Sequence, residues 1–184
     1  DGLVAHFSAI AEASELPVVV YNVPGRTGVD LLPETVATLA RHKHIVGIKE
    51  ATGDMVRVSR IRELLGPDDR FTLLSGDDFT LLPFLALGGH GVISVTSNVA
   101  PAWISTICRA AAAGRWDEAR TWHYKQLPLA RALFGQPNPI PVKSAMALLG
   151  RCSAEMRLPL ISIDPHSRDG QALSDALQTL GLLS

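Results

Sequence analysis

A fourfold alternation of short apolar runs with longer helix-like segments constrains the fold of this chain most. The runs are rich in β-branched and other apolar residues, and they lie at 16–23 (LPVVVYNV), 44–49 (HIVGIK), 70–76 (RFTLLSG) and 91–95 (GVISV). Their apolar character is continuous rather than alternating, which is typical of parallel strands covered by helices. Parallel strands also need a long crossover, which a helix usually supplies. The sequence therefore predicts an α/β fold with a parallel sheet.

Helix signals fill the segments between these runs. Residues 1–15 read as an amphipathic helix, and Pro33 stands where a first helical turn tolerates proline. Asp54 and Asp77 each precede an apolar helical pattern, so each is predicted to cap a helix. The predicted buried positions are Val36, Leu39 and Ala40, then Val58, Ile61 and Leu65, then Leu81, Leu82 and Leu85. The predicted stop signals are Gly66, Pro67, Gly88, Gly89 and Gly114.

After the fourth run the pattern is mostly helical. The predicted helices lie at 98–114, 115–134, 142–149 and 169–180. Pro101 fits the first turn of the first of these, and Pro128 is expected to kink or break the second.

Length and strand count leave two architectures open. A chain of 184 residues fits one domain with a real core. A (β/α)8 barrel needs eight strands and about 250 residues, and this chain supplies half of those strands. An open dinucleotide-binding sheet usually has a GxGxxG turn, which this sequence lacks. The pattern alone does not decide between an open sheet and part of a barrel.

Composition argues against several classes of function. The net charge is −1 without any basic block, so nucleic-acid binding lacks its electrostatic patch. No apolar run approaches the roughly 20 residues that cross a bilayer, and the amphipathic start does not read as a signal peptide. Cys108 and Cys152 have no partner motif, so a reducing cytoplasm is expected. His42, His44 and His90 lack neighbouring ligands, and no metal site is predicted.

Polar residues gather where the apolar runs stop. Ligands bind at the carboxyl ends of the strands in open α/β sheets and in barrels alike. The candidate site residues at or beside these ends are Tyr21, Asn22, Lys49, Glu50, Ser75, Gly76, Ile93 and Ser94.

Lys49 closes a run built for burial and is one of four lysines. In a water-poor pocket, desolvation disfavours the ammonium form, and a neutral amine can attack a carbonyl to form a Schiff base. The alternative is a lysine that extends from the strand end to solvent. Position alone favours the exposed lysine.

Three further residues suit chemistry on a carbonyl compound. Tyr21 carries a phenol that could pass protons, although a packed tyrosine is the simpler alternative. Arg26 lies in the loop NVPGRTG, where a guanidinium could hold a carboxylate by two-point contact or face solvent. Gly76 lets a ligand approach the backbone.

Five motifs resemble the dihydrodipicolinate synthase family, within the pyruvate-dependent aldolase superfamily that includes N-acetylneuraminate lyase. The motifs are YNVPGRTG (21–28), GIKEATGD (47–54), LLSGDD (73–78), GGHGVISVTSN (88–98) and PNPIPVK (137–143). Each alone is weak, whereas five in the family's order over nearly the whole chain are a specific signal.

The resemblance implies a (β/α)8 TIM barrel of which this chain holds the second half, strands 5–8. Residues 1–114 would form that half and residues 115–184 a C-terminal helical extension. The chain is therefore expected to be only the C-terminal part of such an enzyme.

The resemblance also implies a role for each candidate residue. Lys49 matches the Schiff-base lysine that attacks pyruvate, and Tyr21 matches the tyrosine that relays protons. Arg26 matches the arginine that holds the carboxylate of aspartate semialdehyde. The remaining substrate-binding candidates are Gly76, Ile93 and Asn22. A Schiff-base amine needs no metal or organic cofactor to stabilise the carbanion, so no cofactor is predicted.

The implied reaction is the condensation of pyruvate with L-aspartate 4-semialdehyde, an early step of lysine biosynthesis. The resemblance further implies a cytoplasmic homo-oligomer, either a dimer or a tetramer. One alternative is a related aldolase acting on a keto-deoxy sugar acid, N-acetylneuraminate or 4-hydroxy-2-oxoglutarate. Another is a non-catalytic truncated remnant. Residues 1–184 alone are expected to have little or no synthase activity.

Overall fold

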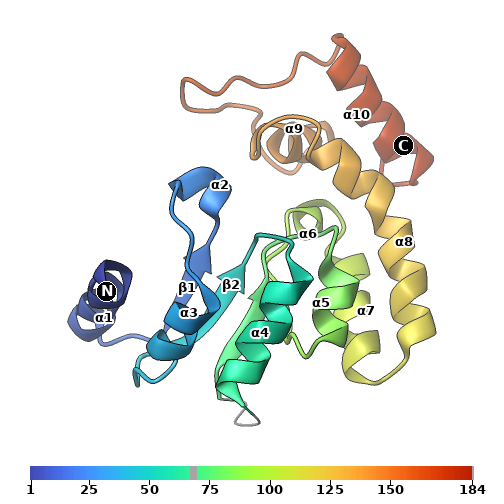
Figure 1. Ribbon diagram of the computed structural model, residues 1–184. Helices are drawn as coiled ribbons and strands as arrows, with labels where there is room; N and C mark the ends of the chain where they lie inside the picture. The colour runs from blue at the N-terminus through green and yellow to red at the C-terminus, as the bar shows by residue number, and fades with distance from the viewer. Residues whose placement is uncertain (67–69, 184) are drawn as a thin grey trace. The chain divides into compact units, whose positions relative to one another are not determined.

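The computed structural model describes residues 1–66 and 70–183, and the chain divides into two compact units (Figure 1). The first unit is Asp1–Ile93 and the second is Ser94–Ser184. This division by compactness differs from the expected division into barrel and extension after residue 114, which stays a prediction.

The first unit is built on a four-stranded sheet in the order β1-β2-β3-β4. Every neighbouring pair is parallel, which confirms the predicted fold class. The strands are β1 (Val18–Asn22), β2 (Ile45–Glu50), β3 (Thr72–Ser75) and β4 (Gly91–Val92). The helices are α1 (Gly2–Ser14), α2 (Pro24–Thr27), α3 (Pro33–Leu39), α4 (Met55–Leu65) and α5 (Leu81–Ala86).

One face of this sheet forms the core of the first unit. Val20, Ile48 and Leu73, one from each of three adjacent strands, are at most 3% exposed and join the same apolar cluster. The buried sides of α3 and α4 complete that cluster, and full burial of each such side chain stabilises the fold by about 1.5–3 kcal/mol. The two helices lie side by side along the sheet (Figure 1).

The other face of the sheet is more exposed than the continuous apolar runs suggested. Val19 and Tyr21 on β1 are 42% and 43% exposed, and Ile93 after β4 is 48% exposed. At these positions of the described chain, the continuous apolar runs therefore do not correspond to burial on both faces of the sheet.

The capping predictions had different outcomes. The carboxylate of Asp54 accepts hydrogen bonds from the backbone N–H groups of Val56 and Arg57, so Asp54 caps α4 as predicted. Asp77 instead accepts from the backbone and hydroxyl of Thr80, which is itself the N-cap of α5. Asp77 therefore stabilises a turn before the helix, and the prediction that it caps α5 is wrong.

The ends of the helices and strands agree only in part with those predicted from the sequence. Gly66 ends α4 as predicted, whereas the stop signal at Pro67 lies outside the described residues. β4 covers two residues rather than 91–95, because the chain turns at 93–95 into the short helix α6 (Thr96–Val99). The loop expected after β1 contains the one-turn helix α2.

The second unit is helical, as the sequence predicted. It contains α6, α7 (Pro101–Ala112), α8 (Trp116–Leu133), α9 (Ile140–Leu148) and α10 (Arg168–Thr179). Leu129, Leu133 and Leu177 are fully buried in its apolar cluster. α8 continues through Pro128, which is exposed. The prediction that this proline breaks the helix is therefore wrong. Among the described helices, none combines the length and the apolar character that a membrane span requires.

Candidate functional site

The register of the sheet sorts the strand-end residues onto two faces. Tyr21 of β1 pairs with Lys49 of β2, and Asn22 pairs with Glu50. Paired residues of parallel strands project to the same face, and successive residues project to opposite faces. Tyr21 and Lys49 therefore share the exposed face, while Asn22 and Glu50 share the face covered by helices.

Lys49 and Tyr21 lie close together on the exposed face. The Nζ atom of Lys49 is 4.0 Å from the centroid of the Tyr21 ring. The lysine is partly buried. An ammonium group over an aromatic face is stabilised by a cation–π interaction. The arrangement brings an amine, which can form an imine with a carbonyl compound, close to a phenol, which can transfer protons.

Gly76 makes room for Lys49. Its backbone N–H donates to the carbonyl oxygen of Glu50 at 2.7 Å, which fixes the chain next to the end of β2. A Cβ atom at Gly76 would lie 3.0 Å from Cε of Lys49 and 2.5 Å from Cβ of Ala51. From the sequence, Gly76 was expected to let a ligand approach the backbone. In the structure, the Lys49 side chain lies beside Gly76.

Arg26 and Ile93 lie shortly after the ends of β1 and β4. Arg26 is exposed on α2, which begins two residues after Asn22 and is followed by its C-cap Gly28 with φ 69°. The backbone N–H of Ile93 donates to Ser75 at 2.9 Å, and its side chain is 48% exposed. The structure thus places Arg26 on a short helix that follows β1, and Ile93 directly after β4.

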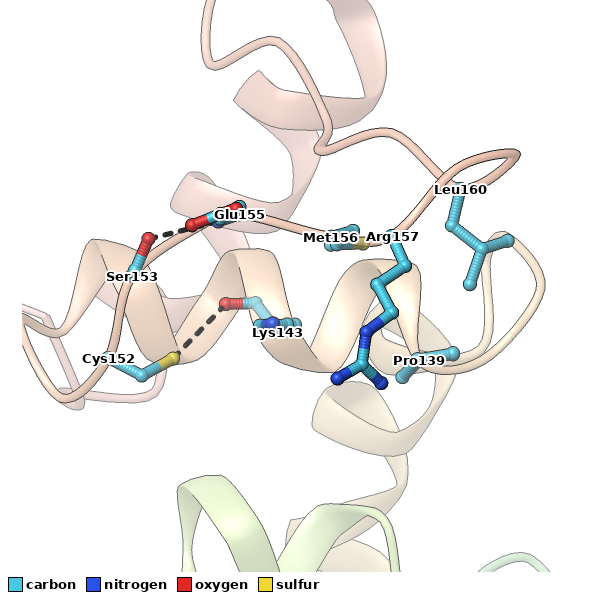
Figure 2. Close-up of a pocket in the computed structure, with 8 residues that line it drawn as sticks. All are labelled: Pro139, Lys143, Cys152, Ser153, Glu155, Met156, Arg157 and Leu160. Atoms are coloured by element: carbon cyan, nitrogen blue, oxygen red, sulfur yellow. Dashed lines mark hydrogen bonds between the residues drawn. The ribbon is translucent and has the colours of Figure 1, made fainter.

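A cavity in the second unit contains none of the predicted site residues (Figure 2). Its volume is about 550 Å³, and it lies between α9 and the segment 151–160. The lining residues are Pro139, Lys143, Cys152, Ser153, Glu155, Met156, Arg157 and Leu160. Lys143 and Arg157 give its wall two cations, and Glu155 gives it one carboxylate. The Sγ atom of Cys152 is 3.9 Å from the carbonyl oxygen of Lys143 rather than next to a base, so these groups do not form a nucleophile–base pair.

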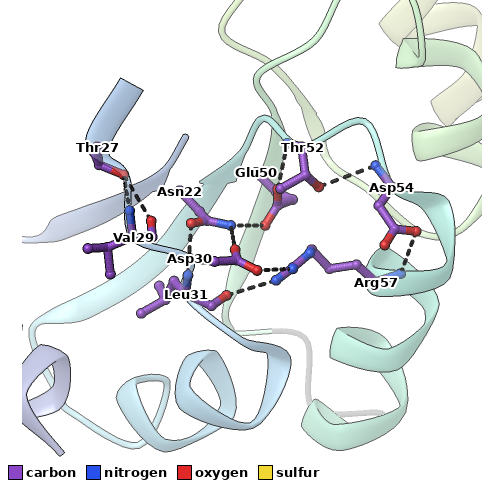
Figure 3. A network of polar contacts seen from close by, with 9 residues as sticks. All are labelled: Asn22, Thr27, Val29, Asp30, Leu31, Glu50, Thr52, Asp54 and Arg57. Atoms are coloured by element: carbon purple, nitrogen blue, oxygen red, sulfur yellow. Dashed lines mark hydrogen bonds and ion pairs between the residues drawn. The ribbon is translucent and has the colours of Figure 1, made fainter. Parts of the chain in front are cut away.

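A buried polar network on the helix-covered face was missed by the sequence reasoning (Figure 3). Asn22 is 2% exposed, and its amide nitrogen donates to Asp30 at 3.0 Å and to Glu50 at 2.9 Å. Its amide oxygen accepts from the backbone N–H of Leu31 at 3.0 Å. Asn22 was expected to bind substrate, yet its amide is engaged inside the protein, on the face opposite Lys49.

His90 is hydrogen-bonded to the backbone, and Cys108 is a partly buried free cysteine. The Nδ1 atom of His90 accepts from the backbone N–H of Leu73 at 3.0 Å. Burial raises the pKa of the Cys108 thiol, which keeps it protonated and weakly nucleophilic near neutral pH. Within residues 1–66 and 70–183, no group of three or more His, Cys, Asp or Glu side chains is arranged to hold a metal ion.

Comparison with known proteins gives consistent results. The model of the Dihydrodipicolinate synthetase family matches residues 1–179. A 4-hydroxy-tetrahydrodipicolinate synthase of Nitratidesulfovibrio vulgaris (strain DP4) is 51% identical over 184 residues, which is 100% of this chain. Dihydrodipicolinate synthase from Thermotoga maritima superposes with a TM-score of 0.94 at 43% identity over 99% of this chain. The chloride-inhibited enzyme from Acinetobacter baumannii, complexed with pyruvate, superposes with a TM-score of 0.93 at 42% identity over 99%.

The chain spans less than two thirds of these relatives. It covers 62% of the Nitratidesulfovibrio enzyme, 62% of the Thermotoga chain and 61% of the Acinetobacter chain. The placement of this chain in the C-terminal part of such an enzyme stays a prediction. The family prediction itself is confirmed, together with an α/β fold that fits part of a TIM barrel. This chain belongs to the Dihydrodipicolinate synthetase family.

Proposed function

We propose that the protein containing this chain is a 4-hydroxy-tetrahydrodipicolinate synthase, which condenses pyruvate with L-aspartate 4-semialdehyde. The observation that carries the proposal is the pairing of Lys49 with Tyr21 at the carboxyl ends of β2 and β1, with Nζ 4.0 Å from the ring centroid. The printed name of the Nitratidesulfovibrio relative and the pyruvate bound by the Acinetobacter enzyme support the substrates.

In the proposed first step, the lone pair of the Lys49 amine attacks the keto carbon of pyruvate. The carbonyl oxygen takes up protons and leaves as water, which gives an imine. Tyr21 supplies and accepts these protons through its phenol. Loss of a methyl proton then converts the imine to an enamine, with the electron pair delocalised onto the nitrogen that Lys49 contributes.

In the second step, the enamine carbon attacks the aldehyde carbon of L-aspartate 4-semialdehyde and forms the new carbon–carbon bond. The amino group of that substrate next attacks the imine carbon, closes the ring and releases the Lys49 amine. Arg26 orients the aldehyde by holding its carboxylate, which lowers the entropic part of the barrier. Gly76 and Ile93 present backbone groups beside the bound keto acid. The cycle consumes no metal or organic cofactor.

Comparing two lysine variants tests the proposal. Lys49→Arg keeps a long basic side chain but removes the nucleophilic amine, and it should lower the condensation rate by about a thousandfold or more. Lys43→Arg is the matched control, because Lys43 is exposed and lies outside the sheet's strand ends, and it should keep the wild-type rate. Equal rates in Lys49→Arg and wild type would overturn the proposal.

The choice of substrate distinguishes the alternatives. The protein should turn over L-aspartate 4-semialdehyde faster than keto-deoxy sugar acids, N-acetylneuraminate or 4-hydroxy-2-oxoglutarate. Faster cleavage of one of those acids would instead identify a related pyruvate aldolase. The absence of any reaction in the native protein would identify a non-catalytic remnant.

We further propose that the protein works in the cytoplasm as a homo-oligomer, either a dimer or a tetramer. Residues 1–184 alone should show little or no synthase activity, because the chain spans 62% of the Nitratidesulfovibrio enzyme. Co-expression with the part of that enzyme which the chain does not cover should restore activity, and sedimentation should then give the oligomeric state. Full activity of residues 1–184 alone would contradict the expectation.

A further inference from the structure

We propose that Asn22, Asp30, Glu50 and Arg57 form a positioning cluster that fixes the segment carrying Arg26 against the strand carrying Lys49. This inference rests on the proposed function, because the groups that the cluster positions are those of the proposed condensation. Figure 3 shows the cluster between the ends of β1 and β2, the segment 29–31 and the start of α4.

Each carboxylate oxygen of Asp30 and Glu50 accepts a hydrogen bond. Both oxygens of Asp30 accept, one from Asn22 at 3.0 Å and one from Arg57 at 2.5 Å. Both oxygens of Glu50 accept as well, one from Asn22 at 2.9 Å and one from the backbone N–H of Thr52 at 2.7 Å. Hydrogen bonds to charged groups are the strong ones, so the pairing of all four carboxylate oxygens indicates a rigid unit. Within the described chain, Nε of Arg57 is buried without a hydrogen-bond partner, so the guanidinium acts through its two terminal nitrogens.

The charged side chains of the cluster are buried or partly buried, so their hydrogen bonds are not easily replaced by water. Glu50 is 3% exposed, and the side chains of Arg57 and Asp30 are 12% and 34% exposed. A buried carboxylate beside a second carboxylate is unfavourable unless donors lie between them. The Asn22 amide is that donor, and the Arg57 guanidinium compensates the charge of Asp30.

The cluster holds the sheet together directly beside the reactive pair. Asn22 follows Tyr21 in β1, Glu50 follows Lys49 in β2, and the two cluster residues are themselves register partners. The Asn22–Glu50 hydrogen bond therefore fixes the two strands one residue beyond the phenol and the amine. It does so from the opposite face, where substrate and solvent do not compete for the bond.

The cluster also anchors the segment that carries Arg26. This segment leaves the sheet at Asn22 and returns at Asp30 and Leu31. Arg57 donates to the carbonyl oxygen of Leu31 at 2.9 Å and to the carboxylate of Asp30, so α4 holds the far end of the segment. Asn22 holds both the near end and, through the N–H of Leu31, the far end. Fixing both ends limits where Arg26 can move.

Replacing one arginine of α4 tests the cluster, with a second arginine on the same helix as control. Arg57→Gln removes the bonds to Asp30 and Leu31. Arg60→Gln is the matched control, because Arg60 pairs with the exposed side chains of Glu34 and Glu63. In the native protein, Arg57→Gln should raise the KM for L-aspartate 4-semialdehyde by about tenfold, and Arg60→Gln should leave it unchanged.

A second variant separates the two roles of the cluster, which are to hold β1 against β2 beside the reactive pair and to anchor the segment that carries Arg26. Glu50→Gln keeps the shape of the side chain but places an amide N–H against either Asn22 or the N–H of Thr52. It should lower kcat by about tenfold through the Tyr21–Lys49 geometry, with a smaller change in the KM for the aldehyde. Rates are expressed per molecule that pyruvate and borohydride can trap, so loss of folded protein does not lower them.

Hydrogen exchange of residues 23–31 in the native protein gives a readout that does not depend on the reaction. Arg57→Gln should speed exchange in this segment by about tenfold over Arg60→Gln. Unchanged exchange and unchanged KM in Arg57→Gln would overturn the positioning cluster, even if the protein is a synthase. Faster exchange in Arg57→Gln than in Arg60→Gln would retain the anchoring role even if the wild-type protein neither traps nor condenses pyruvate, in which case the proposed function alone fails.

Discussion

The position of the Lys49 side chain depends on the absence of a Cβ atom at Gly76. A Cβ atom at Gly76 would lie 3.0 Å from Cε of Lys49, whereas carbon atoms in contact prefer separations of about 3.5–4.0 Å. The same atom would lie 2.5 Å from Cβ of Ala51. No other residue fits at position 76 unless the lysine or the strand end moves.

We therefore expect Gly76→Ala to displace Lys49 and to slow pyruvate trapping. Overpacking of this kind costs about 1–3 kcal/mol, which corresponds to a rate loss of about 5-fold to 150-fold if the strain falls on the lysine. Gly2→Ala is the control, because a Cβ atom there meets nothing within 4 Å. The rate of borohydride trapping would be measured for both variants. A wild-type rate in Gly76→Ala would show that the lysine position does not need this glycine.

At the same scale, the sequence predicted part of the site. Lys49, Tyr21 and Asn22 were candidates because they lie at the ends of predicted strands, and the structure brings the first two together. Asn22 lies on the other face because neighbouring residues of a strand project in opposite directions. That two-residue period is present in the sequence and could have separated Asn22 from Tyr21. Asp30 and Arg57 could not be found this way, because tertiary structure alone brings Asn22, Asp30 and Arg57 together.

At the scale of helices and strands, two aspartates show how far local patterns reach. Asp54 stands directly before α4 and caps it, whereas Asp77 stands three residues before Thr80, the N-cap of α5. Both follow a strand and precede an apolar pattern, so the sequence alone gives them the same role. The one-turn helices α2 and α6 were missed because four residues are too short to show a helical period.

Removal of the Asp54 cap should destabilise the protein without changing its chemistry. Asp54→Ala leaves two backbone N–H groups of α4 without their acceptor and should lower the free energy of unfolding by about 1 kcal/mol. Ser59→Ala on the same helix is the control, since Ser59 is exposed and its hydroxyl bonds only to the carbonyl oxygen of Met55 among its described contacts. Urea unfolding of both variants provides the comparison, and equal midpoints would contradict the capping role.

At the scale of the whole chain, the alternation of runs and helices predicted the parallel sheet and the helical second half. The pattern could not reveal that one face of the sheet is more exposed. Continuous apolar runs normally indicate strands covered on both faces, yet Val19, Tyr21 and Ile93 are 42%, 43% and 48% exposed. Burial depends on which elements are present to cover a face, and the sequence of the strands does not contain that information.

The most direct test of the account is the identity of the amine that captures pyruvate. The native protein would be incubated with pyruvate, reduced with borohydride, digested and analysed by mass spectrometry. The account predicts one peptide carrying a reduced pyruvyl group, with the modification on Lys49. An adduct on Lys43, Lys125 or Lys143 instead, or an active preparation in which no lysine is modified, would contradict it.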